Sequence, residues 1–206
     1  RRGFNRGGGI MVTPGTYSVT LEKRINGTHT TLQGPVNFEV VPLFEGALPR
    51  KSNQVINDFR KSVIAFQQDL TSTNISLSKS LKTTNAMLRA LNKASRPTKE
   101  LFKKLNDTRI ILLNIDKELH GNSIKDEIGE RSNPTASDGG SLGWTAFGNT
   151  YGPTDEHMRL LSRVKSQLKK VKKQLSPIIN STLPVLRNKL IKTGAPWIEG
   201  QGLIKD

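Results

Sequence analysis

The stretch "VTPGTYSVTLEKRINGTHTTLQGPVNFEVVPL", Val12 to Leu43, decides the fold class of the first part of the chain. Apolar and polar side chains alternate at its start, which is the period of a strand with one buried face. The apolar positions of that alternation are Tyr17, Val19 and Leu21. Asn26-Gly27 follows, the preferred pair for a two-residue hairpin turn because both positions accept positive φ. The pattern therefore predicts a β-hairpin.

Two further strands are expected after this turn. One covers 28–32, and another covers 36–40, after the break at Gly34-Pro35. Three strands cannot close an immunoglobulin-like sandwich, which needs about seven. We therefore predict that 1–43 is an incomplete antiparallel β-sandwich with Ig-like strands. Its remaining strands would lie upstream on the same chain or on a partner chain.

Beyond a connector at 44–51, apolar residues recur every three or four positions over 52–193. This period predicts an antiparallel bundle of about three long helices, and hence an α+β protein. The first helix is marked by Val63, Phe66, Leu70, Thr73, Leu77, Thr84, Leu88 and Leu91. The second, opened by Pro97-Thr98 and closed near Gly121, is marked by Leu101, Leu105, Thr108, Leu112, Ile115 and Leu119.

The third helix is expected to start at Thr154, which can cap it ahead of the acidic pair Asp155-Glu156. Its apolar stripe is Met158, Leu161, Val164, Leu168, Val171 and Leu175. Pro177 and Pro184 predict a bend. Because the apolar phase continues beyond the bend, the helix is expected to continue as well, through Ile179, Leu183, Leu186 and Leu190. The tail, 194–206, has Trp197 as its expected anchor.

Between the second and third helices, 121–153 is rich in Gly, Ser, Asn and Thr and predicts a long loop. Near its start Asp126, Glu127 and Glu130 form an acidic cluster, which is expected on a short solvated helix. Three aromatic residues are spaced along it: Trp144, Phe147 and Tyr151. They either pack against the bundle or contact a partner, and we take them as candidate partner-binding residues.

The net charge of +15 is unevenly distributed. The segment from Arg159 to Lys192 holds ten Lys or Arg and no acidic residue. Such a field attracts polyanions or an acidic protein surface, although a solvated helix face has the same composition. The candidate partner-binding residues of this surface are Arg163, Lys169, Lys170, Lys172 and Lys173.

The sequence contains no motif that is typical of a catalytic or cofactor-binding site. There is no cysteine, and His29, His120 and His157 lack the spacing of metal ligands. The acidic run has no carboxylate partner held across a cleft. No apolar run approaches the roughly 20 residues of a membrane span. We therefore expect no catalytic, metal or cofactor site and no transmembrane segment, and nucleic acid is a less favoured partner because aromatic and basic residues are not interleaved.

The ordered motifs "GGGIMVTPGTYSVTL", "PVNFEVVPL" and "GPTDEHMRLL" resemble the C-terminal region of sortilin-like, BNR-repeat β-propeller proteins of Bacteroidota, often labelled glycosyl hydrolases. The strand motif of that family matches Pro14, Gly15, Thr16, Tyr17, Val19 and Leu21, and its helix start matches Pro153 and Thr154. The family's "DPR" after the last strand is replaced here by "VPLFEGALPRKS". The segment that follows the last strand of the sandwich is thus expected to differ from that of the family.

The resemblance implies that an upstream β-propeller and the missing Ig-like strands precede this region. The expected function is a non-catalytic structural and interaction module of a bacterial extracytoplasmic protein, in the periplasm, at the outer-membrane surface or secreted. It would buttress the propeller and dock a partner in an envelope complex. Two alternatives remain: an accessory domain of a glycoside-processing enzyme, whose hydrolase activity would lie in the propeller, and a basic helical protein that binds a polyanion.

Overall fold

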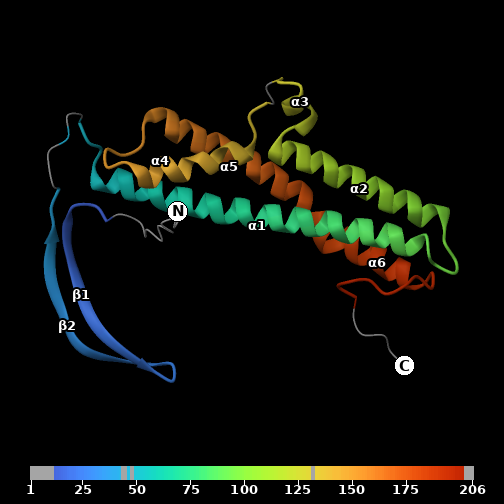
Figure 1. The fold of residues 1–206 in the computed structure, drawn as a ribbon, viewed down its shortest axis with the longest axis horizontal. Coiled ribbons are helices and arrows are strands. Elements are labelled where there is room, and N and C mark those ends of the chain that lie inside the picture. The colour runs from blue at the N-terminus through green and yellow to red at the C-terminus, as the bar shows by residue number, and fades with distance from the viewer. Residues whose placement is uncertain (1–11, 43–45, 47–48, 131–132, 202–206) are drawn as a thin grey trace, which may run out of the picture. The chain divides into compact units, whose positions relative to one another are not determined.

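The computed structural model describes residues 12–42, 46, 49–130 and 133–201. It is an α+β structure, a two-stranded antiparallel sheet followed by helices (Figure 1). The chain divides into two compact units. One comprises Arg1–Val63 with Leu142–Met158, and the other comprises Ile64–Ser141 with Arg159–Asp206.

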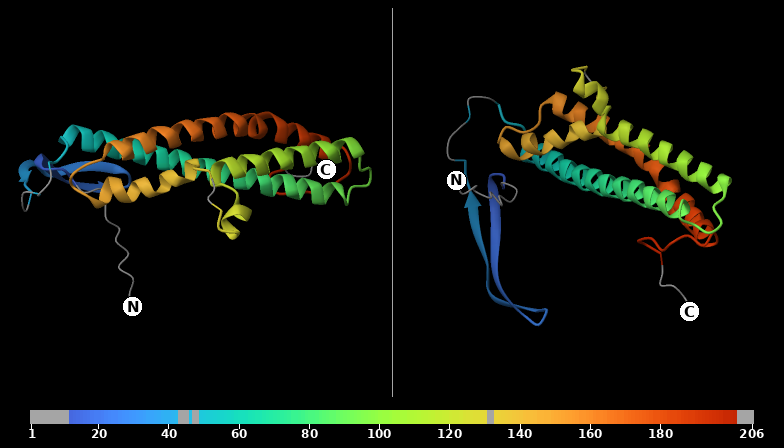
Figure 2. Two further views of the ribbon diagram at one scale, coloured as in Figure 1. Left: turned by 90° about the horizontal axis from the view of Figure 1, so that it is seen from above. Right: turned by 45° about the vertical axis from the view of Figure 1, so that its right-hand side comes forward.

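The strands of the first unit form a single hairpin, visible in both views of Figure 2. β1 (Gly15–Ile25) pairs with β2 (Thr28–Val40) across the turn predicted from the sequence. Asn26 has a φ of 49° and Gly27 a φ of 84°, the left-handed conformations that a tight hairpin turn requires. The hairpin prediction is confirmed.

The prediction of three strands is wrong, because β2 runs without interruption through Gly34-Pro35. Val19 pairs with Val36 and Leu21 with Gln33, so β2 carries an extra residue there and absorbs the proline in a bulge. Gly34 has a φ of 109°, and a Cβ at this position would lie 2.7 Å from the Val19 carbonyl oxygen. Only glycine fits so close to the neighbouring strand.

The base of the hairpin is tied to α1 (Asn53–Leu91) by hydrogen bonds. The amide of Asn53 donates to the Pro14 carbonyl at 2.8 Å, and the amide of Asn57 donates to the Thr13 hydroxyl at 3.5 Å. Ser52 accepts a hydrogen bond from the backbone of Val55, as a capping residue does. The helix therefore begins where its first turn is capped and anchored.

α1 ends at Leu91, the last residue of its predicted apolar stripe, and begins ten residues before the first, Val63. The stripe includes hydroxyl side chains. Thr73, Ser80 and Thr84 are buried, and each donates to the carbonyl four residues earlier, at 2.7–2.8 Å. This bond satisfies the hydroxyl within the helix itself, so burial leaves no unpaired donor. Near the end of the helix Met87 is buried while Leu88 is half-buried, a shift of one position from the expected stripe.

α2 (Lys99–His120) follows its prediction at both ends. Thr98 is the N-cap and its side chain accepts from the Leu101 backbone, while Gly121 ends the helix with a φ of 95°. All six stripe residues are buried: Leu101, Leu105, Thr108, Leu112, Ile115 and Leu119.

The described part of the segment 121–153, which was expected as a long loop, contains three short helical elements. They are α3 (Ser123–Glu127), the 3₁₀ helix η1 (Ala136–Ser141) and α4 (Leu142–Gly148). Of the predicted acidic cluster, Asp126 and Glu127 lie in α3 as expected, whereas Glu130 lies beyond its end. The backbone N–H of Thr135 donates to the Asp138 carboxylate at 2.8 Å, and the Ser137 hydroxyl donates to the Leu119 carbonyl at 2.8 Å. Small polar residues that indicate a loop thus form caps and anchors here.

The last helical stretch consists of α5 (Asp155–Pro177), the π-helical η2 (Ile178–Thr182) and α6 (Leu183–Ile191), continuous in Figure 2. As predicted, it continues past both prolines. Thr154 caps α5 by accepting from the backbone of His157 at 3.3 Å. The Leu183 N–H donates to the Ile178 carbonyl, five residues back, so the turn holds one extra residue just before Pro184.

The extra residue changes which side chains are buried. Ile178, 7 % exposed, takes the buried position expected for Ile179, and the stripe resumes at Leu183. At the other end of the stripe, Met158 is exposed rather than buried. Ile198, not the expected Trp197, anchors the tail: Ile198 is buried, whereas Trp197 is 53 % exposed. Ile198 joins a core cluster with Met87, Ala90, Leu91, Leu101, Leu105, Leu186 and Leu190.

Candidate functional site

The three histidines lie on three different elements, and each has a partner nearby in the sequence. His29 contacts Glu22 at 3.2 Å across the hairpin, and His120 contacts Asp116 at 2.9 Å one turn away. His157 accepts from the Thr154 N–H at 3.2 Å at the start of α5. Within the described part of the chain, no three His, Asp or Glu side chains are grouped as metal ligands would be. No described helix combines the length and apolarity needed to cross a membrane.

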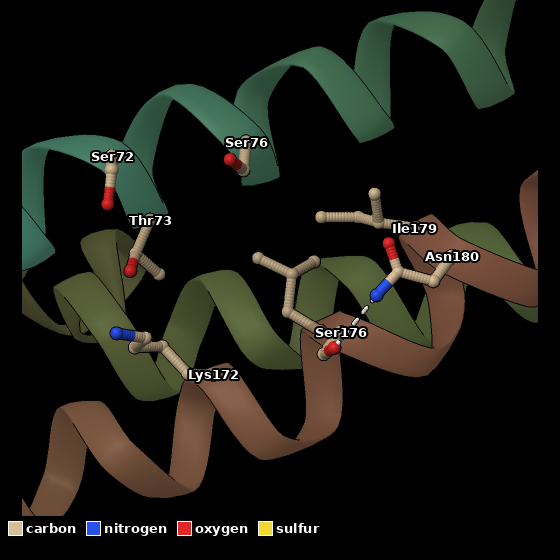
Figure 3. A pocket seen from close by; sticks show the side chains of 8 residues that line it. Ser72, Thr73, Ser76, Lys172, Ser176, Ile179 and Asn180 are labelled. Carbon is tan, nitrogen blue, oxygen red and sulfur yellow. Dashed lines mark hydrogen bonds between the residues drawn. The ribbon is translucent and has the colours of Figure 1, made fainter.

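A hollow of about 190 Å³ lies between α1 and the α5–η2 stretch (Figure 3). Three of its polar side chains have partners within the protein. Thr73 donates to its own helix, Lys172 pairs with Asp69 at 2.9 Å, and Asn180 donates to Ser176 at 3.1 Å. Because these groups bond to their own or the adjacent helix, the hollow has the character of a helix junction rather than of a reaction site.

The three candidate aromatic residues lie in the first unit but in different environments. Trp144 projects from α4 and is 86 % exposed, while Phe147 and Tyr151 are half-buried. The Tyr151 carbonyl accepts from the Lys51 backbone at 2.9 Å, so this residue joins the segment before α1 to the segment before α5. Of the three, Trp144 is the one available for contact with another molecule.

Arg60 is a buried residue of this unit that no sequence pattern indicated. It is 4 % exposed, and its Nε donates to the Ala146 carbonyl in α4 at 2.9 Å. Burial, and then the nearby Arg50, lower the pKa of Arg60 from its ordinary value. The guanidinium holds α4, and therefore the Trp144 helix, against α1.

The candidate basic residues of α5 all lie on its exposed face, in the second unit: Arg163, Lys169, Lys170, Lys172 and Lys173. Lys172 is already paired with Asp69. The buried positions of the same helix are Leu161, Val164, Leu168, Val171 and Leu175. The charged residues therefore spread around the solvated side of the helix instead of converging on one point.

The hairpin has an apolar face that lies open in the structure. Tyr17 stacks on Phe38 with ring centroids 6.0 Å apart, and the next pair on this face is Val19 with Val36. Val19 is 55 % and Phe38 48 % exposed. The opposite face carries polar pairs such as Ser18 with Asn37. The hairpin is thus amphipathic, with an uncovered apolar side.

A second basic surface, missed from the sequence, lies where α2 begins and α6 ends. Arg96, Lys104, Lys189 and Lys192 line a hollow of about 360 Å³ there. Two residues of this set stand close to the Thr98 helix start and two close to the end of α6, so nothing local in the sequence unites them. The local signal in the sequence was limited to Arg96, two residues before the Thr98 N-cap, and Lys104 within the helix.

The comparisons with known proteins gave no relative: no protein-family model, no curated protein and no solved structure matches this chain.

Proposed function

We propose that this chain is a non-catalytic structural and interaction module of a larger bacterial extracytoplasmic protein. In this proposal the hairpin belongs to an immunoglobulin-like β-module. The helices α1, α2 and α5–α6 form an antiparallel three-helix bundle that buttresses an upstream β-propeller and docks a partner. The observation that carries the proposal is the open apolar face of the hairpin.

A two-stranded hairpin with one uncovered apolar face is marginally stable in water on its own. Val19, Val36 and Phe38 each leave about half of their surface exposed, at 55 %, 52 % and 48 %. Covering each of them would add on the order of 1 kcal/mol. In a β-sandwich the inner face of a second sheet provides this cover, which supports further strands as the occupant of the face.

The helical part supports a structural role through the polar contacts between its helices. Asn85 accepts from Arg109 at 3.0 Å, joining α1 to α2, and Gln174 donates to Glu118 at 3.1 Å, joining α5 to α2. These contacts pair side chains at the rims of the helix interfaces. The connection of seven residues between α1 and α2 is short, which favours antiparallel neighbours.

The upstream propeller and the extracytoplasmic location rest on the resemblance of the ordered strand and helix-start motifs. The deciding experiment uses the native polypeptide from its source. Denaturing mass spectrometry should give a mass several times the 22.8 kDa of this sequence. Hydrogen exchange on that polypeptide should show slow exchange along β1 and β2, because covered strands open rarely.

A matched pair of variants separates the apolar face from general hairpin stability. Val19→Thr with Val36→Thr should speed exchange throughout the hairpin, whereas Ser18→Thr with Asn37→Thr, the neighbouring pair on the polar face, should leave it unchanged. A native mass near 22.8 kDa, or hairpin amides that exchange at the rate of an unstructured peptide, would contradict the proposal.

A further inference from the structure

The hollow between the start of α2 and the end of α6 is built on fixed backbone. The Arg96 N–H donates to the Thr193 carbonyl at 3.1 Å, and the Ser95 hydroxyl donates to the same oxygen at 3.2 Å. Leu101, which is 3 % exposed, lines it and belongs to the same core cluster as the fully buried Leu190. The cationic side chains at its rim are therefore carried by a preorganised frame rather than by a free segment.

The charge lining this hollow is strongly unbalanced. Four cationic side chains line it, and among the described residues of its lining Glu100 is the one that is acidic. Glu100 already accepts a hydrogen bond from Lys104. That bond, the Lys104 charge and then the Lys189 charge lower the pKa of Glu100, so the carboxylate is ionised at neutral pH. One carboxylate offsets one of the four cations, and the described lining of this hollow holds no second acidic residue. Asp107 lines the neighbouring hollow that shares Lys104 and Lys189.

The start of α2 adds donors of its own to the hollow. Thr98 is the N-cap, and its hydroxyl accepts from the Leu101 N–H. The first N–H groups of a helix have no partner within the helix, and the helix dipole favours an anion beside them. In α2 these donors are the backbone N–H groups of the first turn, and they lie next to the four cationic side chains. The helix dipole and the cationic side chains thus both favour an anionic ligand.

A second hollow, of about 430 Å³, adjoins the basic one and shares Lys104 and Lys189 with it. Its lining combines the acidic Asp107 and three hydroxyl side chains with apolar side chains, among them Ile111 and Val185. These two apolar side chains are 50 % and 51 % exposed. A ligand that places an anionic group among the cations has room beside it for an apolar part.

We propose that this surface binds the phosphate group of a phosphate monoester whose organic part is apolar. The phosphate lies among Arg96, Lys104, Lys189 and Lys192, and the organic part lies against Ile111 and Val185. Lysine and arginine supply charge-assisted hydrogen bonds to phosphate oxygens. The site shares no residue with the hairpin, so the outcome of its test does not depend on the proposed function.

The test is an NMR titration of the whole chain with inorganic phosphate and with phenyl phosphate at constant ionic strength. The amide signals of Lys99 and Glu100, in the first turn of α2, should shift with saturation, and phenyl phosphate should bind several-fold more tightly than inorganic phosphate. Lys189→Gln with Lys192→Gln should weaken binding by about tenfold or more. Val185→Ser should remove the advantage of phenyl phosphate over inorganic phosphate.

The matched control removes the same charge elsewhere: Lys169→Gln with Lys173→Gln, two exposed lysines of α5, should change the affinity by less than about twofold. An equal loss in both double variants would overturn the proposal, because it would show nonspecific attraction to a basic protein. Absence of a saturable shift of the α2 amides up to about 10 mM phosphate would also overturn it, and this readout needs no variant to fold.

Two sources of such a phosphate are distinguished by a sedimentation assay with phosphatidylcholine vesicles containing phosphatidic acid. Cosedimentation that is lost in Lys189→Gln with Lys192→Gln identifies a lipid headgroup. Binding of phenyl phosphate without cosedimentation identifies a soluble ester.

Discussion

Gly139 has no side chain, and the ring of Phe66 occupies the space where a Cβ would stand. The Cγ2 atom of Val164 would lie 2.9 Å from the same Cβ. Phe66 is 2 % exposed and Val164 is fully buried, so neither side chain can move away without disturbing the core. Adjacent to it, Gly140 has nothing within 4 Å of its own Cβ position. Two neighbouring glycines therefore have opposite packing requirements.

Gly139→Ala should lower the free energy of unfolding by about 1–3 kcal/mol, the usual cost of overpacking a close-packed core. Gly140→Ala is the control and should stay within about 0.5 kcal/mol, since its methyl group meets open space. Urea denaturation followed by far-UV circular dichroism measures both. Equal effects of the two substitutions would show that η1 does not pack against Phe66 as described.

At the scale of elements, the sequence predicted what depends on neighbouring residues along the chain. The α2 stripe and its Thr98 cap are local patterns, and both are present in the structure. The hairpin turn at Asn26-Gly27 is local as well. β2 was divided wrongly because a Gly-Pro pair signals a break locally, whereas pairing with β1 carries the strand through it. Tertiary pairing thus overrides a local signal.

The candidate functional residues likewise divide into those that a local sequence pattern revealed and those that only the fold brings together. The exposed α5 lysines were found because they form a run in the sequence. The hollow at the start of α2 was missed because its cations come from 96–104 and from 189–192, segments that only the fold brings together. The π-helical turn was missed too, because the apolar spacing around Ile178 and Ile179 fits two helical phases. Only burial distinguishes between these phases.

The π-helical turn gives a prediction at this scale. Deleting Asn180 together with Pro184→Ala should convert η2 to an α-helical turn and keep Leu183, Leu186 and Leu190 in their buried positions. The stability should change by no more than about 1 kcal/mol. Deleting Ser166 from the regular part of α5 should instead rotate the residues that follow by about 100° and cost several kcal/mol, because leucines leave the core.

Urea denaturation of the two deletion variants, with circular dichroism for helix content, checks this expectation. A loss of several kcal/mol on deleting Asn180 would mean that the extra residue is required for packing, contrary to the interpretation of η2 as an insertion.

At the scale of the whole molecule, the dominant quantity is the net charge of +15, much of it on the second unit. The folded chain holds these charges closer together than the unfolded chain does, so their mutual repulsion opposes folding. The local ion pairs, such as Lys172 with Asp69, neutralise a small part of this excess. Exposed pairs of this kind contribute little, typically below about 1 kcal/mol. Stability should therefore depend on how strongly salt screens the repulsion.

We expect the melting temperature to rise as NaCl increases from about 0.01 M to about 0.1 M, because the screening length falls from about 30 Å to about 10 Å. The variant Lys169→Gln, Lys170→Gln, Lys173→Gln removes three exposed α5 charges. At low salt it should melt about 2–4 °C higher than the unsubstituted chain, the shift that about 1 kcal/mol produces in a protein of this size. It should also gain less from added NaCl, since less repulsion remains to be screened. Thermal denaturation by circular dichroism gives both quantities, and a melting temperature that falls with NaCl, or a variant that melts lower at low salt, would show that these lysines stabilise the fold through favourable contacts instead.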